Sequence, residues 1–184
     1  MKFNIPNSLT ITRILLIPLI VYLFLSNEES YRILIFFLFL LATITDYLDG
    51  FFARYLKQVT SFGEFLDPVA DKLLVIITLI LLVTENQDIL FLIPVLIIVT
   101  REFLVIAIRQ RLAEVGENIK LSVLLISKIK TAIQLISLLL LLFKFPLFGV
   151  DIYQVGIYLL QIASLLTLIS FFSYAKKSWS VIIK

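Results

Sequence analysis

The stretch DYLDGFFARYLKQVTSFGEFLDPVAD, residues 46–71, contains four of the six aspartates of this chain: Asp46, Asp49, Asp67 and Asp71. The chain around it is 61% hydrophobic. A carboxylate at membrane depth costs roughly 2.5–3.5 kcal/mol on insertion scales, so carboxylates kept there usually serve a function. The concentration of four in one short stretch therefore indicates an ion or metal site.

The spacing of these aspartates indicates how they meet. Asp46 and Asp49 are three residues apart and Asp67 and Asp71 are four apart, so each pair lies on one face of a helix. The short connection between the pairs turns the chain back and lets the two faces approach. Four carboxylates at low dielectric repel one another unless cations neutralise them. Oxygen ligands favour Mg²⁺, Mn²⁺ or Ca²⁺, and two such ions on a diphosphate suit an in-line phosphoryl displacement.

Composition narrows the class of protein. A mean hydropathy of +1.08 and long apolar runs indicate an integral membrane protein, and 184 residues correspond to one domain. The chain has no cysteine and no histidine, which excludes disulfides, thiolate chemistry and His/Cys zinc sites. A general base must then be a carboxylate, a lysine or a tyrosine. The basic residues are scattered at helix ends, which suits anionic headgroups or phosphorylated substrates and argues against nucleic acid.

The apolar runs predict an all-α fold of six transmembrane helices within a single domain, residues 1–184. The expected helices cover residues 9–25, 31–53, 64–84, 89–111, 121–143 and 152–174. Short links make neighbouring helices antiparallel. Ser61 and Glu64 form a capping box that starts the third helix near Phe62, which places Pro68 inside it; a start nearer Asp67 is the alternative.

Charge predicts the orientation. With the N-terminus in the cytoplasm, all Lys and Arg residues except Arg32 and Lys144 fall on the inner side, as the positive-inside rule requires. Polar residues, among them Thr10 and Arg13, also gather at the inner ends of five of the six helices. We therefore expect a polar, metal-binding cavity open to the cytoplasm, in the cell membrane, with both termini cytoplasmic. Snorkelling explains basic residues such as Arg109 and Lys176 but not short aspartates.

The residues between the two aspartate pairs each have more than one interpretation. Gly50, Ala53 and Gly63 let a flat ligand or another backbone approach closely, although helix packing alone also explains them. Arg54 is a salt-bridge partner for Asp49, a positive-inside anchor or a ligand contact.

The combined pattern Asp46-x2-Asp49-Gly50-x2-Ala53-Arg54-x8-Gly63-x3-Asp67-x3-Asp71 resembles the complete signature of the CDP-alcohol phosphatidyltransferases. In that family an alcohol attacks a CDP-linked lipid, the phosphatidyl group is transferred and CMP leaves. The resemblance implies six membrane helices and two Mg²⁺ or Mn²⁺ ions held by the four aspartates, with Asp71 also the general base. It further implies that the nucleotide-lipid is contacted by Asp49, Gly50, Ala53, Arg54 and Gly63. A homodimer is common in the family.

Further similarity suggests the acceptor alcohol. Residues 4–13, 66–74, 101–103 and 128–134 are similar to the branch that uses CDP-diacylglycerol and glycerol 3-phosphate, although Ser127 stands where that branch often has glycine. The acceptor phosphate needs fixed cations, and Arg109, Lys128, Lys130 and Arg101 are the candidates. Positive-inside anchoring explains the same four residues.

Three alternative functions remain open from the sequence alone. A cardiolipin synthase of the CDP-alcohol type, with phosphatidylglycerol as acceptor, shares the N-terminal similarity and the segment Asp67–Lys72. A secondary transporter with an intramembrane carboxylate site predicts inverted repeats, which the chain does not show. A structural membrane subunit leaves the four aspartates without a purpose.

Overall fold

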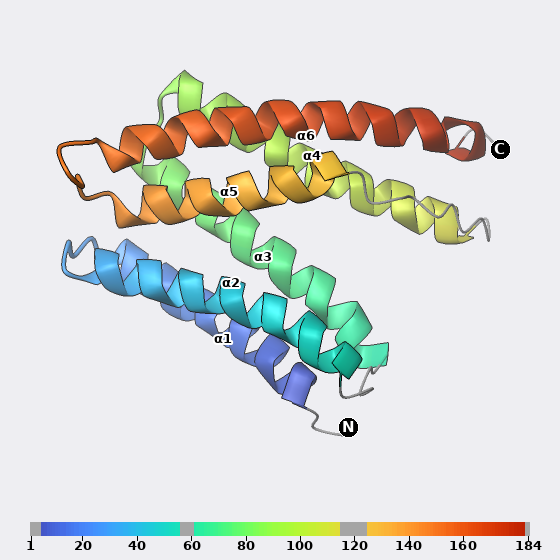
Figure 1. Cartoon of the computed structure of the whole chain (residues 1–184), viewed down its shortest axis with the longest axis horizontal. Helices are drawn as coiled ribbons and strands as arrows, with labels where there is room; N and C mark the ends of the chain where they lie inside the picture. Colours follow the sequence, from blue (N-terminus) through green and yellow to red (C-terminus); the bar gives the residue numbers. More distant parts are fainter. Residues whose placement is uncertain (1–4, 56–60, 115–124, 183–184) are drawn as a thin grey trace. The chain divides into compact units, whose positions relative to one another are not determined.

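The described part of the chain, residues 5–55, 61–114 and 125–182 of a computed structural model, forms six helices and no β-strand (Figure 1). Residues 1–4, 56–60, 115–124 and 183–184 lie outside the description. The helices are α1 (Ile5–Leu25), α2 (Tyr31–Tyr55), α3 (Ser61–Glu85), α4 (Ile89–Glu114), α5 (Leu125–Phe143) and α6 (Ile152–Ile182). The all-α prediction with six helices is confirmed.

The helix boundaries differ from the expected ones mainly at the polar ends. α1 begins at Ile5 rather than residue 9, and α6 continues to Ile182 rather than ending at 174. α3 begins at Ser61 and contains Pro68, so the earlier of the two expected helix starts is correct and a start near Asp67 is not. The periodic apolar pattern stops where lysines, serines and threonines begin, but those residues continue a helix without difficulty.

Apolar length alone identifies three of the described helices as able to cross a membrane. They are residues Ser8–Leu25 of α1, Ile89–Leu112 of α4 and Ile152–Lys176 of α6. Large apolar side chains on these helices face outward, for example Tyr22, Leu96 and Phe172. Such contiguous apolar surface suits lipid and would be an aggregation hazard in water. The chain is therefore a membrane protein.

Contacts divide the chain into two compact units, which are described separately. The first comprises Met1–Glu85 and Leu139–Tyr153. Here α1 and α2 run antiparallel through a tight turn at Ser26–Ser30, and α1 packs against both α2 and α3 (Figure 1). Its core is formed by fully buried side chains such as Ile20, Phe39 and Leu82.

One end of the first unit is closed by an ion-pair cluster. Arg32 of α2 pairs with Glu85 of α3, and its guanidinium lies 4.7 Å from the ring centroid of Phe24. Lys144 Nζ lies 3.6 Å from the second Glu85 oxygen. The two cations that the charge pattern leaves on the outer side thus meet at one carboxylate. The cluster is at the opposite ends of α2 and α3 from the aspartates of residues 46–71.

The second unit comprises Asn86–Leu138 and Gln154–Lys184, and polar contacts between backbones and side chains join its helices. Asp88 caps the start of α4, where its Oδ1 accepts the Leu90 N–H at 3.2 Å. The Ser137 hydroxyl of α5 donates to the Gly156 carbonyl of α6 at 2.7 Å, and both residues are buried. A small residue on each side allows these two helices to approach closely.

Candidate active site

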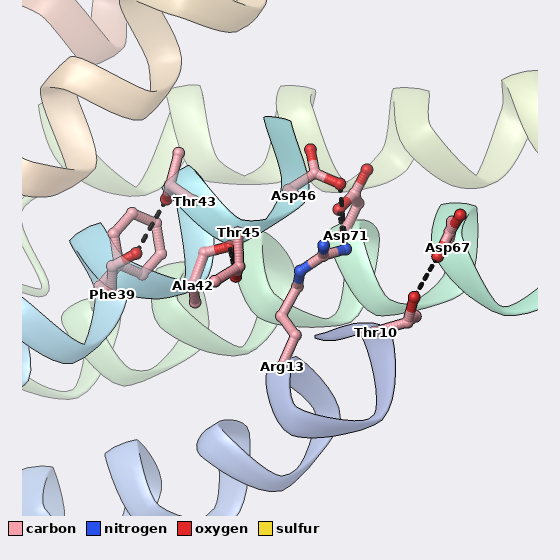
Figure 2. Close-up of polar contacts among 9 residues, drawn as sticks. All are labelled: Thr10, Arg13, Phe39, Ala42, Thr43, Thr45, Asp46, Asp67 and Asp71. Atoms are coloured by element: carbon pink, nitrogen blue, oxygen red, sulfur yellow. Dashed lines mark hydrogen bonds and ion pairs between the residues drawn. The ribbon is translucent and has the colours of Figure 1, made fainter. Parts of the chain in front are cut away.

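The buried guanidinium of Arg13 connects the two aspartate-bearing helices. Its Nη1 lies 3.0 Å from Asp46 Oδ1 of α2 and 2.9 Å from Asp71 Oδ1 of α3 (Figure 2). Arg13 itself is fully buried, while the two carboxylate side chains are 41% and 43% exposed. The cation therefore lies beneath the pair, and each carboxylate presents its remaining surface outward.

Thr10 extends the same contact surface of α1 to a third aspartate. Its hydroxyl donates to Asp67 Oδ1, and Thr10 is fully buried (Figure 2). Thr10 and Arg13 are three residues apart, so they lie on one face of α1. That face thereby contacts Asp46, Asp67 and Asp71, which come from α2 and α3. The predicted meeting of the two aspartate pairs across these helices is seen for the described carboxylates.

The hydroxyls next to Asp46 are used within α2. Thr43 Oγ1 donates to the Phe39 carbonyl and Thr45 Oγ1 to the Ala42 carbonyl, each at 2.9 Å (Figure 2). Such back-bonding is the usual arrangement for threonine inside an apolar helix. Both hydroxyl protons are therefore hydrogen-bonded to backbone carbonyls and are not available to a ligand. The Asp46 carboxylate is the described group at this end of α2 that can bind an ion.

The described residues fit a divalent cation in their chemistry. Asp46 and Asp71 converge on one nitrogen, are partly exposed, and offer the oxygen donors that Mg²⁺ and Mn²⁺ prefer. Within the described residues, however, no group of three His, Cys, Asp or Glu side chains is close enough to form a metal centre. Asp67 is bound to Thr10, and the Asp49 side chain is outside the described part. The structure thus brings two predicted ligands together around a cation of the protein itself.

The predicted nucleotide-lipid contacts fall mostly outside the description. The side chains of Asp49, Ala53 and Arg54, and the surroundings of Gly50, lie outside the described residues, although α2 is helical through all four positions. Gly63 is described and buried in the first turn of α3. Its burial agrees with close approach by another group, as either interpretation of this glycine requires.

The predicted acceptor-phosphate residues divide into two pairs. Lys130 Nζ of α5 lies 3.0 Å from Glu102 Oε1 of α4, and Arg101 Nη1 lies 2.8 Å from the same oxygen. Lys130 and Glu102 are 5% and 12% exposed, so the contact is largely desolvated. Arg109 and Lys128 are exposed on α4 and α5. A buried carboxylate that fixes two cations is a stronger feature than a snorkelling lysine.

Two side chains in direct contact with the aspartates were not among the predicted site residues. Thr10 and Arg13 appeared only as polar residues at the inner end of the first helix. The sequence did contain a signal for them, because a hydroxyl and a guanidinium three residues apart in an otherwise apolar helix lie on one face and indicate a polar contact there. Glu102 lies within the similar segment 101–103, but nothing in the sequence indicated its pairing with Lys130.

Comparison with known proteins identifies the family of the chain. The family model described as CDP-alcohol phosphatidyltransferase matches residues 3–175, nearly the whole chain. The chain belongs to the CDP-alcohol phosphatidyltransferase family, a family of membrane-embedded enzymes that generally depend on divalent metal ions.

Several curated relatives match along almost their full length, and each is named as a CDP-diacylglycerol–glycerol-3-phosphate 3-phosphatidyltransferase. The relative from Wigglesworthia glossinidia brevipalpis is 42% identical, with 97% of each chain covered. The one from Rickettsia typhi is 46% identical, covering 94% of this chain and 96% of its own. The one from Haemophilus influenzae is 42% identical, covering 95% and 92%. The similarity therefore covers more than nine-tenths of the chain.

Proposed function

We propose that this protein transfers the phosphatidyl group of CDP-diacylglycerol to glycerol 3-phosphate, producing phosphatidylglycerophosphate and CMP in phospholipid biosynthesis. The observation that carries the proposal is 42–46% identity to relatives named for this reaction, over more than nine-tenths of each chain. The uninterrupted family pattern of residues 46–71 supports the same chemistry. The whole chain, residues 1–184, acts as one catalytic membrane domain.

The aspartates form the metal centre of this proposal. Asp46, Asp49, Asp67 and Asp71 hold two Mg²⁺ or Mn²⁺ ions in a cavity open to the cytoplasm. When bound, the ions supply positive charge to the diphosphate of the nucleotide-lipid and make its phosphorus more electrophilic. Support comes from the convergence of Asp46 and Asp71 and from their partial exposure. The donor set contains only oxygen, which suits both ions.

The remaining residues bind and orient the two substrates. Asp49, Gly50, Ala53, Arg54 and Gly63 form the contact surface for the nucleotide-lipid. Asp71 accepts the proton of the glycerol 3-phosphate C1 hydroxyl as that hydroxyl oxygen attacks the phosphatidyl phosphorus. A new phosphorus–oxygen bond forms, and the bond to CMP breaks. With no histidine in the chain, a carboxylate is the natural base.

The acceptor phosphate is bound by fixed cations, for which we propose Lys130 and Arg101, with Arg109 and Lys128 as further contacts. The shared carboxylate of Glu102 supports the first two, because it holds both cations in defined positions. The enzyme lies in the cell membrane with both termini in the cytoplasm, as the charge asymmetry of its helix ends supports. A homodimer is its expected assembly.

A purified-enzyme assay tests the proposal. The protein in detergent is incubated with CDP-diacylglycerol and Mg²⁺ or Mn²⁺, and CMP release is measured with glycerol 3-phosphate, phosphatidylglycerol, serine or inositol as acceptor. Release with glycerol 3-phosphate alone is the expected result. Release only with phosphatidylglycerol would identify a cardiolipin synthase instead. No metal-dependent release with any acceptor would favour the transporter or structural classes.

A further inference from the structure

Arg13 has a role that the metal-binding aspartates alone do not explain. It is the fully buried member of a three-residue cluster in which both partners are partly exposed. An unpaired guanidinium is very costly to bury, and two adjacent carboxylates repel each other. The guanidinium therefore stabilises both carboxylates, each carboxylate stabilises the guanidinium, and the cluster carries one net negative charge instead of two.

We propose that Arg13 is a positioning residue and the internal counter-cation of the metal site: it partly neutralises Asp46 and Asp71 in the metal-free protein and weakens, and thereby tunes, their affinity for divalent metal. This inference rests on the proposed function and assigns a regulator to the same site. Arg13 engages the Oδ1 atom of each aspartate from below. That contact fixes the direction of both carboxylates while their exposed surface stays accessible to an ion.

Two opposing effects follow from the removal of Arg13, and their sizes decide the outcome. A unit positive charge about 6 Å from a divalent ion weakens metal binding by roughly a hundredfold at an effective dielectric constant of about 40, a value suited to a partly exposed site, and by more at a lower one. Loss of the clamp frees two short side chains, which must be ordered again when metal binds. That ordering costs about threefold in affinity for each side chain. The charge effect is larger, so metal binding in Arg13→Gln is expected to tighten on the order of tenfold.

The test compares three purified variants with the wild type: Arg13→Gln, Arg13→Lys and, as a matched control, Arg111→Gln. Arg111 is exposed on α4 and pairs with Glu114. Mn²⁺ itself is the probe. Its dissociation constant is measured by electron paramagnetic resonance, and its stabilising effect by thermal unfolding in chelator and in Mn²⁺.

Arg13→Gln should melt at a lower temperature than the wild type in chelator, and Mn²⁺ should raise its melting temperature by more than it raises that of the wild type. Arg13→Lys, which keeps the charge but spans both carboxylates less well, should lie between the two. Arg111→Gln should match the wild type. Recovery of folded Arg13→Gln only in Mn²⁺ is the limiting case of the same result, because the metal then replaces the missing cation.

Other outcomes overturn the inference. An equal loss of stability in chelator and in Mn²⁺, with an unchanged dissociation constant, assigns Arg13 a purely structural role. If folded Arg13→Gln cannot be recovered even in Mn²⁺, the test rests on Arg13→Lys. The proposal is refuted if Arg13→Lys binds Mn²⁺ no more tightly than the wild type does. If the wild type itself binds no Mn²⁺ and releases no CMP, the proposed function has failed as well. If the wild type binds Mn²⁺ but the Arg13 variants bind it with the same affinity, only the proposal for Arg13 has failed.

Discussion

Replacing Asp71 by asparagine is expected to remove the proposed general base while leaving its helix contacts in place. The amide oxygen of asparagine can still accept the Arg13 hydrogen bond that Asp71 Oδ1 accepts at 2.9 Å. Only the charge of the contact is lost, at a side chain that is 43% exposed, so the cost in stability is about 1–2 kcal/mol. In a chain of this length that lowers the melting temperature by about 2–8 °C.

Catalysis should respond far more strongly than stability. A positioned general base contributes roughly 10²–10⁴-fold to a rate, so the substitution should lower kcat for CMP release by a factor in that range. The assay measures CMP release from CDP-diacylglycerol with saturating glycerol 3-phosphate over a series of Mn²⁺ concentrations, up to one that saturates the wild type. The matched control is Asp88→Asn, because asparagine caps a helix as well as aspartate does and Asp88 lies outside the proposed site.

Two results would refute this reasoning. Activity of Asp71→Asn within tenfold of the wild type would show that another group takes the proton. Recovery of the wild-type rate as Mn²⁺ is raised would show that Asp71 serves the metal alone, because added metal compensates a weakened ligand but not a missing base. The thermal unfolding curve of the same preparation separates either result from a general loss of fold.

Three further predictions use other contacts. Lys130→Gln should raise the KM for glycerol 3-phosphate about 10–100-fold, since a charged hydrogen bond is worth about 1.5–3 kcal/mol, with little change in the KM for CDP-diacylglycerol. Lys176→Gln is the exposed control, and equal effects on both substrates would contradict the assignment. Glu102→Gln should lower the free energy of unfolding by about 3 kcal/mol because buried Lys130 loses the charge of its partner; urea or thermal unfolding measures it, and Glu102→Gln/Lys130→Met should recover part of the loss. Thr10→Val should cost about 1–2 kcal/mol by removing the hydrogen bond to Asp67, and should raise the Mn²⁺ concentration needed for half-maximal CMP release; an unchanged metal requirement would mean that Thr10 does not orient this carboxylate.

The apolar segments were predictable because lipid imposes the strongest constraint on the chain. A helix must satisfy its own backbone within the hydrocarbon, so long apolar runs separated by polar turns become helices. The turn at Ser26–Ser30 between α1 and α2 follows from this pattern. Helix ends were harder to predict. α6 continues past Lys176 to Ile182 because nothing in that polar segment breaks a helix.

The aspartate pairs were predictable from spacing, whereas their partners were not. Helix-face spacing shows which residues of one helix lie together, but it does not show which residue of a different helix lies opposite. Lys130 and Glu102 are 28 residues apart, and their contact depends on how α4 and α5 are paired. The alternative interpretation of Lys130 as a membrane-interface anchor was equally consistent with its sequence position.

Arg13 illustrates why charge counting could not complete the site. Positive-inside counting treats every arginine near a cytoplasmic helix end as an anchor that reaches outward to the headgroups. Aspartate cannot reach outward in the same way, because its side chain is too short. When carboxylates stay at depth, a long cationic side chain on a neighbouring helix can turn inward to them, and Arg13 does so from α1 while fully buried. The inward direction of Arg13 thus follows from the carboxylates that it contacts, and the four aspartates of residues 46–71 already implied that a neutralising cation was needed.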